Sequence, residues 1–196
     1  MSVEHSKKHY VIALTGGICS GKSTASRILQ EQGCETIDCD KLGHEAYKPG
    51  SVGFKRVVET FGQRIVKEDG TINRPVLGSI VFGDEKELEK LNQIVQPIIH
   101  DLCLERINES SSEICVVEAA ILLEAKWQDL ADEIWVVSIP TEVAIEPIER
   151  LNSQWSNEQR EQFATKVFYN INQKEFEEQV LTCFHEVQNK LIKSNN

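Results

Sequence analysis

A glycine-rich segment constrains the fold of this 196-residue chain more than any other feature of its sequence. Residues 14–29 read "LTGGICSGKSTASRIL", and the spacing G-x-x-x-x-G-K-[ST] is met by Gly16, Gly21, Lys22 and Ser23. An apolar run at 10–14 precedes the segment and predicts a short strand buried on both faces. A helical apolar pattern follows over 22–32, and Gly33 is a typical helix stop. The segment therefore joins a predicted strand to a predicted helix.

This position gives the loop a physical role as an anion-binding site. Glycine tolerates the backbone angles that let successive N–H groups converge, and the N-terminus of the following helix adds its dipole. Lys22 supplies a cation for the β- and γ-phosphates, and Ser23 supplies a hydroxyl oxygen for Mg²⁺. We predict that nucleotide phosphates are bound by Gly16, Gly17, Ile18, Cys19, Ser20, Gly21, Lys22, Ser23 and Thr24. The motif alone does not separate a kinase from a GTPase or an ATPase.

Further strands and helices alternate along the rest of the chain. Short apolar runs predict strands at 35–37, 113–117, 133–139 and 166–169. Helical spacing predicts helices at 52–61, 75–82 and about 85–106, and a final amphipathic helix that carries Phe176, Val180, Phe184, Val187 and Leu191. Alternation of this kind indicates a single α/β domain in which helices cover both faces of a parallel sheet.

Composition narrows the class of protein. Hydrophobic residues make up 40% of the chain and charged residues 27%, as in ordinary globular proteins. A formal net charge of −10 argues against a general binder of nucleic acid or membrane surfaces, since both attract basic surfaces. The six cysteines form no C-x-x-C pair, so free thiols in a reducing compartment are expected. The N-terminus lacks a secretory pattern and no apolar run reaches membrane-spanning length, so we expect a cytoplasmic protein.

Two aspartates follow the second predicted strand. Asp38 and Asp40 lie just past its carboxyl end, where the sheets of α/β proteins keep their ligand crevice. A carboxylate there can accept a proton from an attacking hydroxyl or support a magnesium ion. Helix capping is the alternative, because a helical stretch is predicted from about Lys41. We favour the functional interpretation for Asp40 and leave both open for Asp38.

Four segments taken together resemble the dephospho-coenzyme A kinase family. They are "LTGGICSGKS" (14–23), "IDCDKLGHEAY" (37–47), "DGTINRPVLGSIVFGDEKELEKLNQIVQPII" (69–99) and "VVEAAILLEAKW" (116–127). The last two look closer to the kinase domain of animal bifunctional coenzyme A synthases than to the bacterial enzymes. The resemblance implies a P-loop fold like that of nucleoside monophosphate kinases, with a five-stranded parallel sheet. It further implies one kinase domain over 1–196, with a helical acceptor-binding part at about 49–112 and a reduced lid at about 141–165.

The resemblance also implies an activity and a set of site residues. Members of the family use ATP to phosphorylate the ribose 3′-hydroxyl of dephospho-CoA. Lys22 would stabilise the transferred charge and Asp40 would be the base. Asp38, His44 and Arg74 would line the acceptor pocket. Ser23 would bind Mg²⁺ directly and Glu118 through a water molecule. From the residues alone, Arg74 could equally form a surface salt bridge, and His44 could simply be packed.

The final quarter of the chain departs from the family pattern. Glu146 and Pro147 stand where the family carries basic residues, and proline disfavours a helix there. Arg150 and Arg160 do not match the arginines of the lid, and the stretch between Arg150 and the last predicted strand is short. An alternative therefore stays open: a nucleotide- or CoA-binding relative with impaired catalysis and a regulatory or assembly role. A GTPase is disfavoured because the sequence has no N-K-x-D motif.

Overall fold

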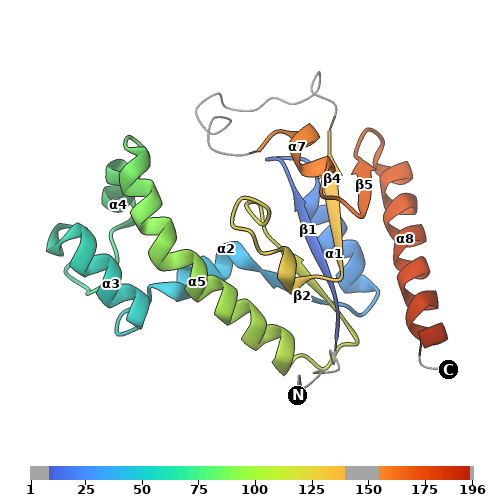
Figure 1. Ribbon diagram of the computed structural model, residues 1–196, viewed down its shortest axis with the longest axis horizontal. Helices are drawn as coiled ribbons and strands as arrows, with labels where there is room; N and C mark the ends of the chain where they lie inside the picture. The colour runs from blue at the N-terminus through green and yellow to red at the C-terminus, as the bar shows by residue number, and fades with distance from the viewer. Residues whose placement is uncertain (1–8, 140–154, 195–196) are drawn as a thin grey trace, which may run out of the picture. The chain divides into compact units, whose positions relative to one another are not determined.

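The computed structural model describes residues 9–139 and 155–194 and falls into two compact units (Figure 1). The second unit is Asp38–Arg106, and the first contains the described residues on either side of it in the sequence. The assignment of one kinase domain, with a helical part at about 49–112 and a lid at about 141–165, stays a prediction. Residues 140–154 of that lid lie outside the described residues.

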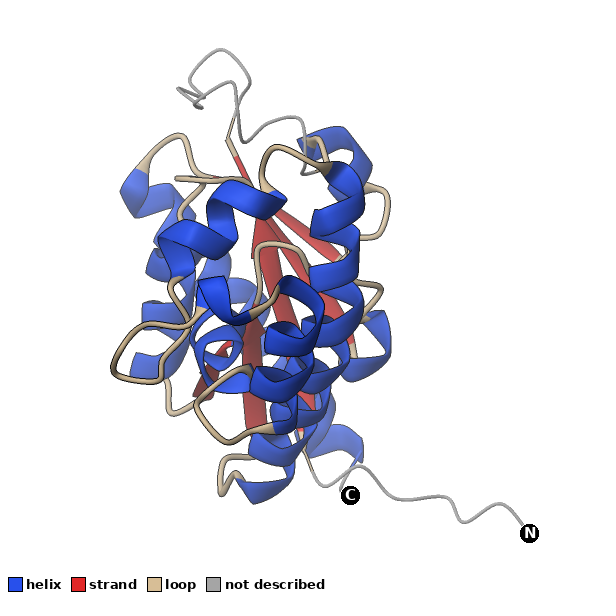
Figure 2. Ribbon diagram, turned by 90° about the vertical axis from the view of Figure 1, so that its left-hand side faces the viewer, coloured by secondary structure: helices blue, strands red, loops and turns tan. Residues whose placement is uncertain are grey.

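A five-stranded sheet forms the first unit, and its strands lie side by side (Figure 2). The strands are β1 (Tyr10–Gly16), β2 (Glu35–Asp38), β3 (Ile114–Glu118), β4 (Glu133–Ser138) and β5 (Lys166–Tyr169), in the spatial order β2-β3-β1-β4-β5. β1 pairs in parallel with β3 and β4, and β4 pairs in parallel with β5. The α/β fold class and the five predicted strands are confirmed. The strand order reverses between β1 and β3, where such sheets bind their ligands.

Two helices cover one face of this sheet. α1 (Lys22–Glu31) contacts α8 (Gln173–Ser194), and α8 lies alongside β5 (Figure 1). Their shared core contains alternate strand residues together with one stripe from each helix: Ile12, Leu14, Ile114, Val116, Trp135, Val137, Phe168, Ala25, Ile28, Leu29, Phe176, Val180, Phe184 and Val187. The intervening strand residues Val11, Ala13, Cys115 and Val117 are buried as well. The strands are therefore buried on both faces, as their continuous apolar runs predict.

A buried carboxylate ties α8 to the central strands. Glu133, at the start of β4, is 3% exposed and accepts hydrogen bonds from the Tyr10 hydroxyl at 3.0 Å and from Trp135 Nε1 at 2.8 Å. The Lys190 ammonium on α8 also donates to it. Burial tends to raise the pKa of the Glu133 carboxyl, but these donors outweigh burial and hold the pKa below its usual value.

The second unit is helical. It contains α2 (Cys39–Ala46), α3 (Val52–Phe61), a 3₁₀ turn η1 (Gln63–Ile65), α4 (Arg74–Val81) and the part of α5 (Glu85–Glu109) up to Arg106. The predicted helix at 52–61 matches α3. α4 begins one residue before the predicted start, because Asn73 caps it and Pro75 stands in its first turn. α5 continues through Pro97 and ends three residues after the predicted end.

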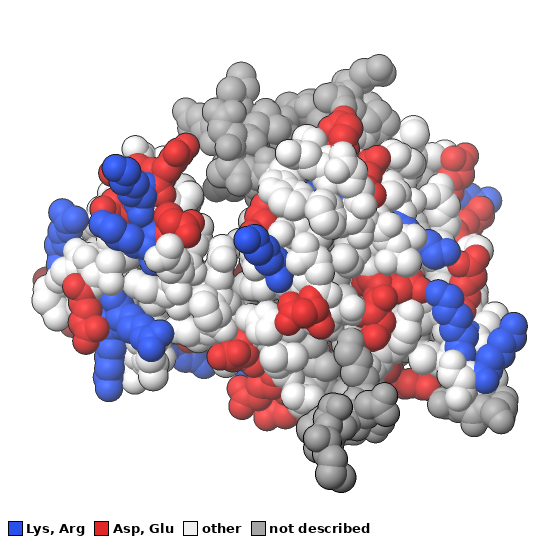
Figure 3. Space-filling view, viewed as in Figure 1, with Lys and Arg blue, Asp and Glu red and all other residues white. Residues whose placement is uncertain are grey.

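The remaining short elements are η2 (Gln128–Leu130) and α7 (Asn157–Glu161), both in the first unit. All six cysteines are free, and Cys19 in the glycine-rich loop is the exposed one. Within the described ranges, no helix combines the length and the apolarity that crossing a membrane requires. Acidic and basic side chains are interspersed on the face that Figure 3 shows.

Candidate functional site

The glycine-rich loop runs from the end of β1 to the start of α1. Gly16 and Gly21 have φ angles of 153° and 106°, which L side chains rarely adopt, so glycine is required at both positions. The Ser20 N–H donates to the Gly17 carbonyl at 3.3 Å, which closes the loop into a turn. Among the described residues, no side chain caps the N-terminus of α1, which begins at Lys22. The N-terminus of a helix attracts anions through its dipole and its backbone N–H groups.

Lys22 and Ser23 occupy the first turn of α1 with their functional groups at the loop. The Lys22 ammonium donates to the carbonyl oxygens of Gly16 at 2.9 Å and Gly17 at 2.8 Å, which holds the cation against the loop. The Ser23 hydroxyl donates to Glu118 Oε1 at 3.4 Å. Glu118 is the last residue of β3 and pairs in register with Leu14 of β1. The structure thus brings together three of the predicted site residues at the carboxyl ends of β1 and β3.

The two aspartates of α2 have different surroundings. Asp38 is the N-cap: its carboxylate accepts the Lys41 N–H at 3.1 Å and pairs with the Lys41 ammonium at 3.0 Å. Burial tends to raise the pKa of the Asp38 carboxyl, but the contacts with Lys41 outweigh burial and lower it. Asp40 is exposed in the first turn of α2. The helix begins at Cys39 rather than near Lys41, so capping belongs to Asp38 and not to Asp40.

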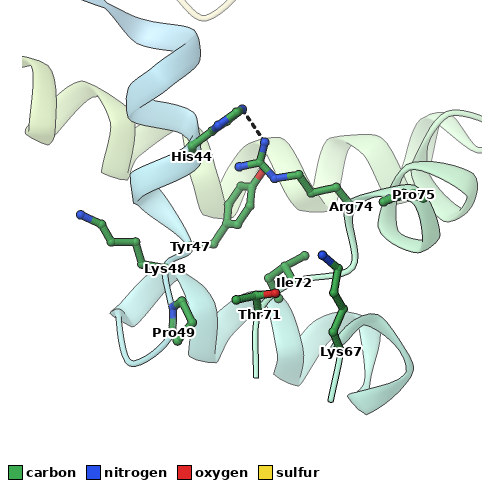
Figure 4. A pocket seen from close by; sticks show the side chains of 9 residues that line it. All are labelled: His44, Tyr47, Lys48, Pro49, Lys67, Thr71, Ile72, Arg74 and Pro75. Carbon is green, nitrogen blue, oxygen red and sulfur yellow. Dashed lines mark hydrogen bonds between the residues drawn. The ribbon is translucent and has the colours of Figure 1, made fainter. Parts of the chain in front are cut away.

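His44 and Arg74 meet in the second unit. The Arg74 guanidinium donates to His44 Nε2 and lies over the Tyr47 ring, 5.4 Å from its centroid (Figure 4). Arg74 is placed by its position as the first residue of α4, directly after the Asn73 cap. The predicted pair therefore forms one contact, and His44 is exposed rather than packed.

A pocket of about 320 Å³ surrounds this contact. Its lining residues come from the end of α2, the loop after it and the segment that leads into α4: His44, Tyr47, Lys48, Pro49, Lys67, Thr71, Ile72, Arg74 and Pro75. The side chains of Lys48 and Lys67 lie on either side of the pocket in Figure 4. The predicted acceptor residues did not include Tyr47, Lys48 and Lys67. The only signal for them was their place within or next to segments that resemble the family.

The described end of the predicted lid is held by one carboxylate. Glu124, in the segment after β3, accepts the Trp155 N–H at 2.9 Å and the Arg160 guanidinium at 3.3 Å. Arg160 is 2% exposed, so its guanidinium is committed to this buried contact. The short helix α7 that carries Arg160 starts with a capping box formed by Ser156 and Gln159. Glu146, Pro147 and Arg150, on which the prediction of a divergent lid rests, lie outside the described residues.

Sequence comparison relates the chain to bacterial enzymes. A dephospho-CoA kinase of Carboxydothermus hydrogenoformans is 39% identical over 188 residues, which cover 88% of this chain and 91% of that protein. A dephospho-CoA kinase of Geobacter sulfurreducens is 43% identical over 138 residues, which cover 69% and 70%. The finer resemblance to the animal bifunctional synthases stays an expectation.

Structural comparison supports the fold. A Thermus thermophilus protein of known crystal structure superimposes with a TM-score of 0.79 at 24% identity, covering 92% of this chain and 98% of that one. A dephospho-CoA kinase from Campylobacter jejuni superimposes with a TM-score of 0.71 at 22% identity, covering 90% and 96%. At these identities the likeness establishes the fold alone. A family model described as dephospho-CoA kinase matches residues 10–178. On this match and on the extent of the sequence identity, the chain belongs to the dephospho-CoA kinase family.

Proposed function

We propose that this chain transfers the γ-phosphoryl group of ATP to the ribose 3′-hydroxyl of dephospho-CoA, which yields CoA and ADP in the last step of CoA biosynthesis. The observation that carries the proposal is the loop before α1, where the Lys22 ammonium and the contact between Ser23 and Glu118 meet at the carboxyl ends of β1 and β3. Family membership indicates the acceptor. The six free cysteines favour a reducing compartment, and we therefore propose a cytoplasmic location.

The nucleotide half of the reaction rests on charge and on backbone N–H groups. Phosphoryl transfer requires positioning and charge neutralisation more than covalent chemistry. The N–H groups at the start of α1 bind the phosphates, and the Lys22 ammonium neutralises charge on the transferred group. The Ser23 hydroxyl and the Glu118 carboxylate, 3.4 Å apart, are oxygen donors of the kind that Mg²⁺ takes together with phosphate oxygens and water. When bound there, Mg²⁺ would supply further neutralisation of the phosphate charge.

The acceptor half rests on the pocket of the second unit. Dephospho-CoA carries a diphosphate, and the pocket has three cationic side chains, those of Lys48, Lys67 and Arg74. A guanidinium suits a phosphate partner because its donors form a rigid fork. Arg74 is held by His44 and by the Tyr47 ring, so less conformational entropy is lost when it binds an anion.

Asp40 is our candidate for the base. Its carboxylate is exposed, whereas that of Asp38 is occupied by Lys41. In the reaction, Asp40 accepts the proton of the ribose 3′-hydroxyl while the oxygen of that hydroxyl attacks the γ-phosphorus and ADP leaves. Asp38 acts at least as the cap that starts α2 and thereby sets the position of Asp40 in the first turn of that helix.

The test is an assay of ADP release that depends on dephospho-CoA, with CoA identified by mass spectrometry. Lys22→Ala and Asp40→Asn are each expected to lower kcat by about a hundredfold or more. Asp101→Asn is the matched control, because that carboxylate is 83% exposed on α5 and has no proposed role. Equal activity in Asp40→Asn and Asp101→Asn would remove Asp40 from the mechanism.

Two further measurements separate the alternatives. Ser23→Ala is expected to raise the Mg²⁺ concentration that gives half-maximal activity, whereas Ser79→Ala on the exposed surface of α4 leaves it unchanged. Binding of ATP without any turnover would refute the proposed activity in favour of a non-catalytic relative. Failure to bind either ATP or dephospho-CoA would defeat both interpretations.

A further inference from the structure

Asn170, the residue directly after β5, contacts the glycine-rich loop from the far end of the sequence. Its backbone N–H donates to the Ser138 carbonyl at 2.9 Å, which continues the pairing of β5 with β4. Its side-chain Nδ2 donates to the Ser20 carbonyl at 3.0 Å. Only the amino end of the amide can donate to a carbonyl, so this hydrogen bond also fixes which end of the amide faces the loop. One residue thus joins the end of the sheet to the loop.

The approach of Asn170 to the loop leaves no space for a side chain at Gly21. A Cβ built on Gly21 would lie 2.3 Å from Asn170 Nδ2. The same holds at the other end of the loop, where a Cβ on Gly16 would lie 2.1 Å from the Val137 carbonyl oxygen of β4. Both motif glycines are therefore packed against the carboxyl ends of β4 and β5. The sheet and Asn170 hold the loop at two points.

The hydrogen bond orients a peptide group in the loop that is proposed to bind the nucleotide phosphates. In a trans peptide the carbonyl and the following N–H point in opposite directions. Because the Ser20 carbonyl faces Asn170, the Gly21 N–H faces away from Asn170. An amide group that is already oriented costs less to bind than one that must be ordered by the ligand.

We propose that Asn170 is a positioning residue for ATP, which holds the Ser20–Gly21 peptide so that the Gly21 N–H faces the phosphates. The proposal rests on the binding of ATP at this loop. The neighbouring side chains have other contacts: the Tyr169 hydroxyl donates to Glu161 at 3.1 Å, and Asn172 Oδ1 accepts the Lys174 N–H at 3.0 Å at the start of α8. Asn172 is therefore a matched control, an asparagine two residues away that caps a helix.

The experiment compares the binding of a fluorescent ATP analogue by Asn170→Ala, Asn170→Asp and the corresponding variants of Asn172. Asn170→Ala is expected to raise the Kd by about threefold to tenfold, the value of one neutral hydrogen bond. Asn170→Asp keeps the shape but loses the donor and places a negative charge beside the phosphates. The Kd of Asn170→Asp for the ATP analogue is expected to exceed that of Asn170→Ala. This difference between the two variants is expected to shrink at high ionic strength, because salt screens the added charge. Asn172→Asp adds the same charge but keeps a capping oxygen, so its Kd is expected to stay within about twofold.

Steady-state kinetics separate positioning from a general loss of structure. We expect both variants of Asn170 to raise KM for ATP and to leave KM for dephospho-CoA unchanged. A Kd for ATP within twofold of wild type in folded Asn170→Asp, or an equal rise in Asn172→Asp, would overturn the proposal. If Asn170→Ala does not fold, the isosteric Asn170→Asp variant decides alone. A wild-type chain that binds ATP without turnover leaves this inference standing and refutes the proposed activity, whereas one that binds no ATP refutes both.

Discussion

Replacement of Gly16 by alanine tests whether the loop is held against the sheet. The added Cβ would lie 2.1 Å from the Val137 carbonyl oxygen and 2.8 Å from Ser20 Oγ. Ordinary van der Waals contact begins near 3.4 Å, so the backbone of the loop and that of β4 must separate by more than an ångström. Val137 lies in the core of the sheet and pairs with Gly16 itself, so a movement of either strand would disrupt core packing and strand pairing.

The cost has two parts. Forcing an extra carbon into a packed site costs about 1–3 kcal/mol. A positive φ angle adds about 1–2 kcal/mol for a residue with a side chain. The free energy of unfolding should therefore fall by about 2–5 kcal/mol, out of a total of about 5–15 kcal/mol for a natural protein. For a chain of this size each kcal/mol lowers Tm by about 2–4 °C, so the expected loss is about 4–20 °C.

Gly33→Ala is the matched control. Gly33 also has a positive φ angle, +90°, but no atom lies within 4 Å of the position of its Cβ. This variant should show the conformational cost alone, about 1–2 kcal/mol. The measurements are thermal unfolding with and without Mg-ATP. Ligand should raise Tm in Gly33→Ala as in wild type, and much less in Gly16→Ala, because the displaced loop binds ATP weakly. A Gly16→Ala protein that matches Gly33→Ala in both Tm and stabilisation by ATP would refute the reasoning.

Three further predictions follow from single side chains. Glu133→Gln should lower the free energy of unfolding by about 2 kcal/mol at pH 7. The pKa of Glu133 is lowered in the folded protein, so its ionised carboxylate stabilises the fold at pH values above the pKa that this glutamate has in the unfolded chain. The difference from wild type should disappear as urea unfolding is measured at pH values falling through the folded pKa. Glu186→Gln is the control, because the Glu186 side chain is 51% exposed in its pair with Lys166. This variant should change the free energy of unfolding by less than about 1 kcal/mol at every pH measured. Glu124→Gln should lower the free energy of unfolding by about 3 kcal/mol, because it removes a carboxylate charge from the buried Arg160 guanidinium; a loss below about 1 kcal/mol in urea unfolding would contradict this. Arg74→Lys should raise KM for dephospho-CoA about tenfold and leave KM for ATP unchanged, because lysine cannot form the bidentate contact; an equal change in both KM values would contradict a role confined to the acceptor.

The sheet and the loop were predictable because their signals are local. The strand at 10–14, the motif and the helix that follows form one continuous pattern, and β1 and α1 lie where that pattern indicates. The start of α2 was placed two residues too late: a start near Lys41 put Asp40 at the capping position, and capping was only one of two interpretations left open for Asp38, which is the cap. The short helix α7 was also not predicted. It has only five residues, and its stability comes from the capping box and from the contact between Arg160 and Glu124, a residue far away in the sequence.

The missed site residues share a different cause. Lys48 and Lys67 lie in loops, where no periodicity marks a side chain as functional, and a lysine on a surface is ordinarily solvated. Asn170 follows a short strand and contacts a loop 150 residues away in the sequence. No pattern within one segment can predict such a contact. These three residues become candidates only when the fold brings their segments to the pocket or to the loop.

Charge distribution resolves an apparent conflict between the acidic composition and two polyanionic substrates. The chain has a net charge of −10, which would repel ATP and dephospho-CoA if it were spread evenly over the binding surfaces. In the proposed function, backbone N–H groups and the Lys22 ammonium attract the nucleotide at the loop, and the cations of Lys48, Lys67 and Arg74 attract the acceptor at the pocket. Arg160 does not contribute, because its guanidinium is buried on Glu124. Arg160 therefore has a structural contact of its own, and within the described part of the chain the cations proposed for the reaction are those of the loop and of the pocket.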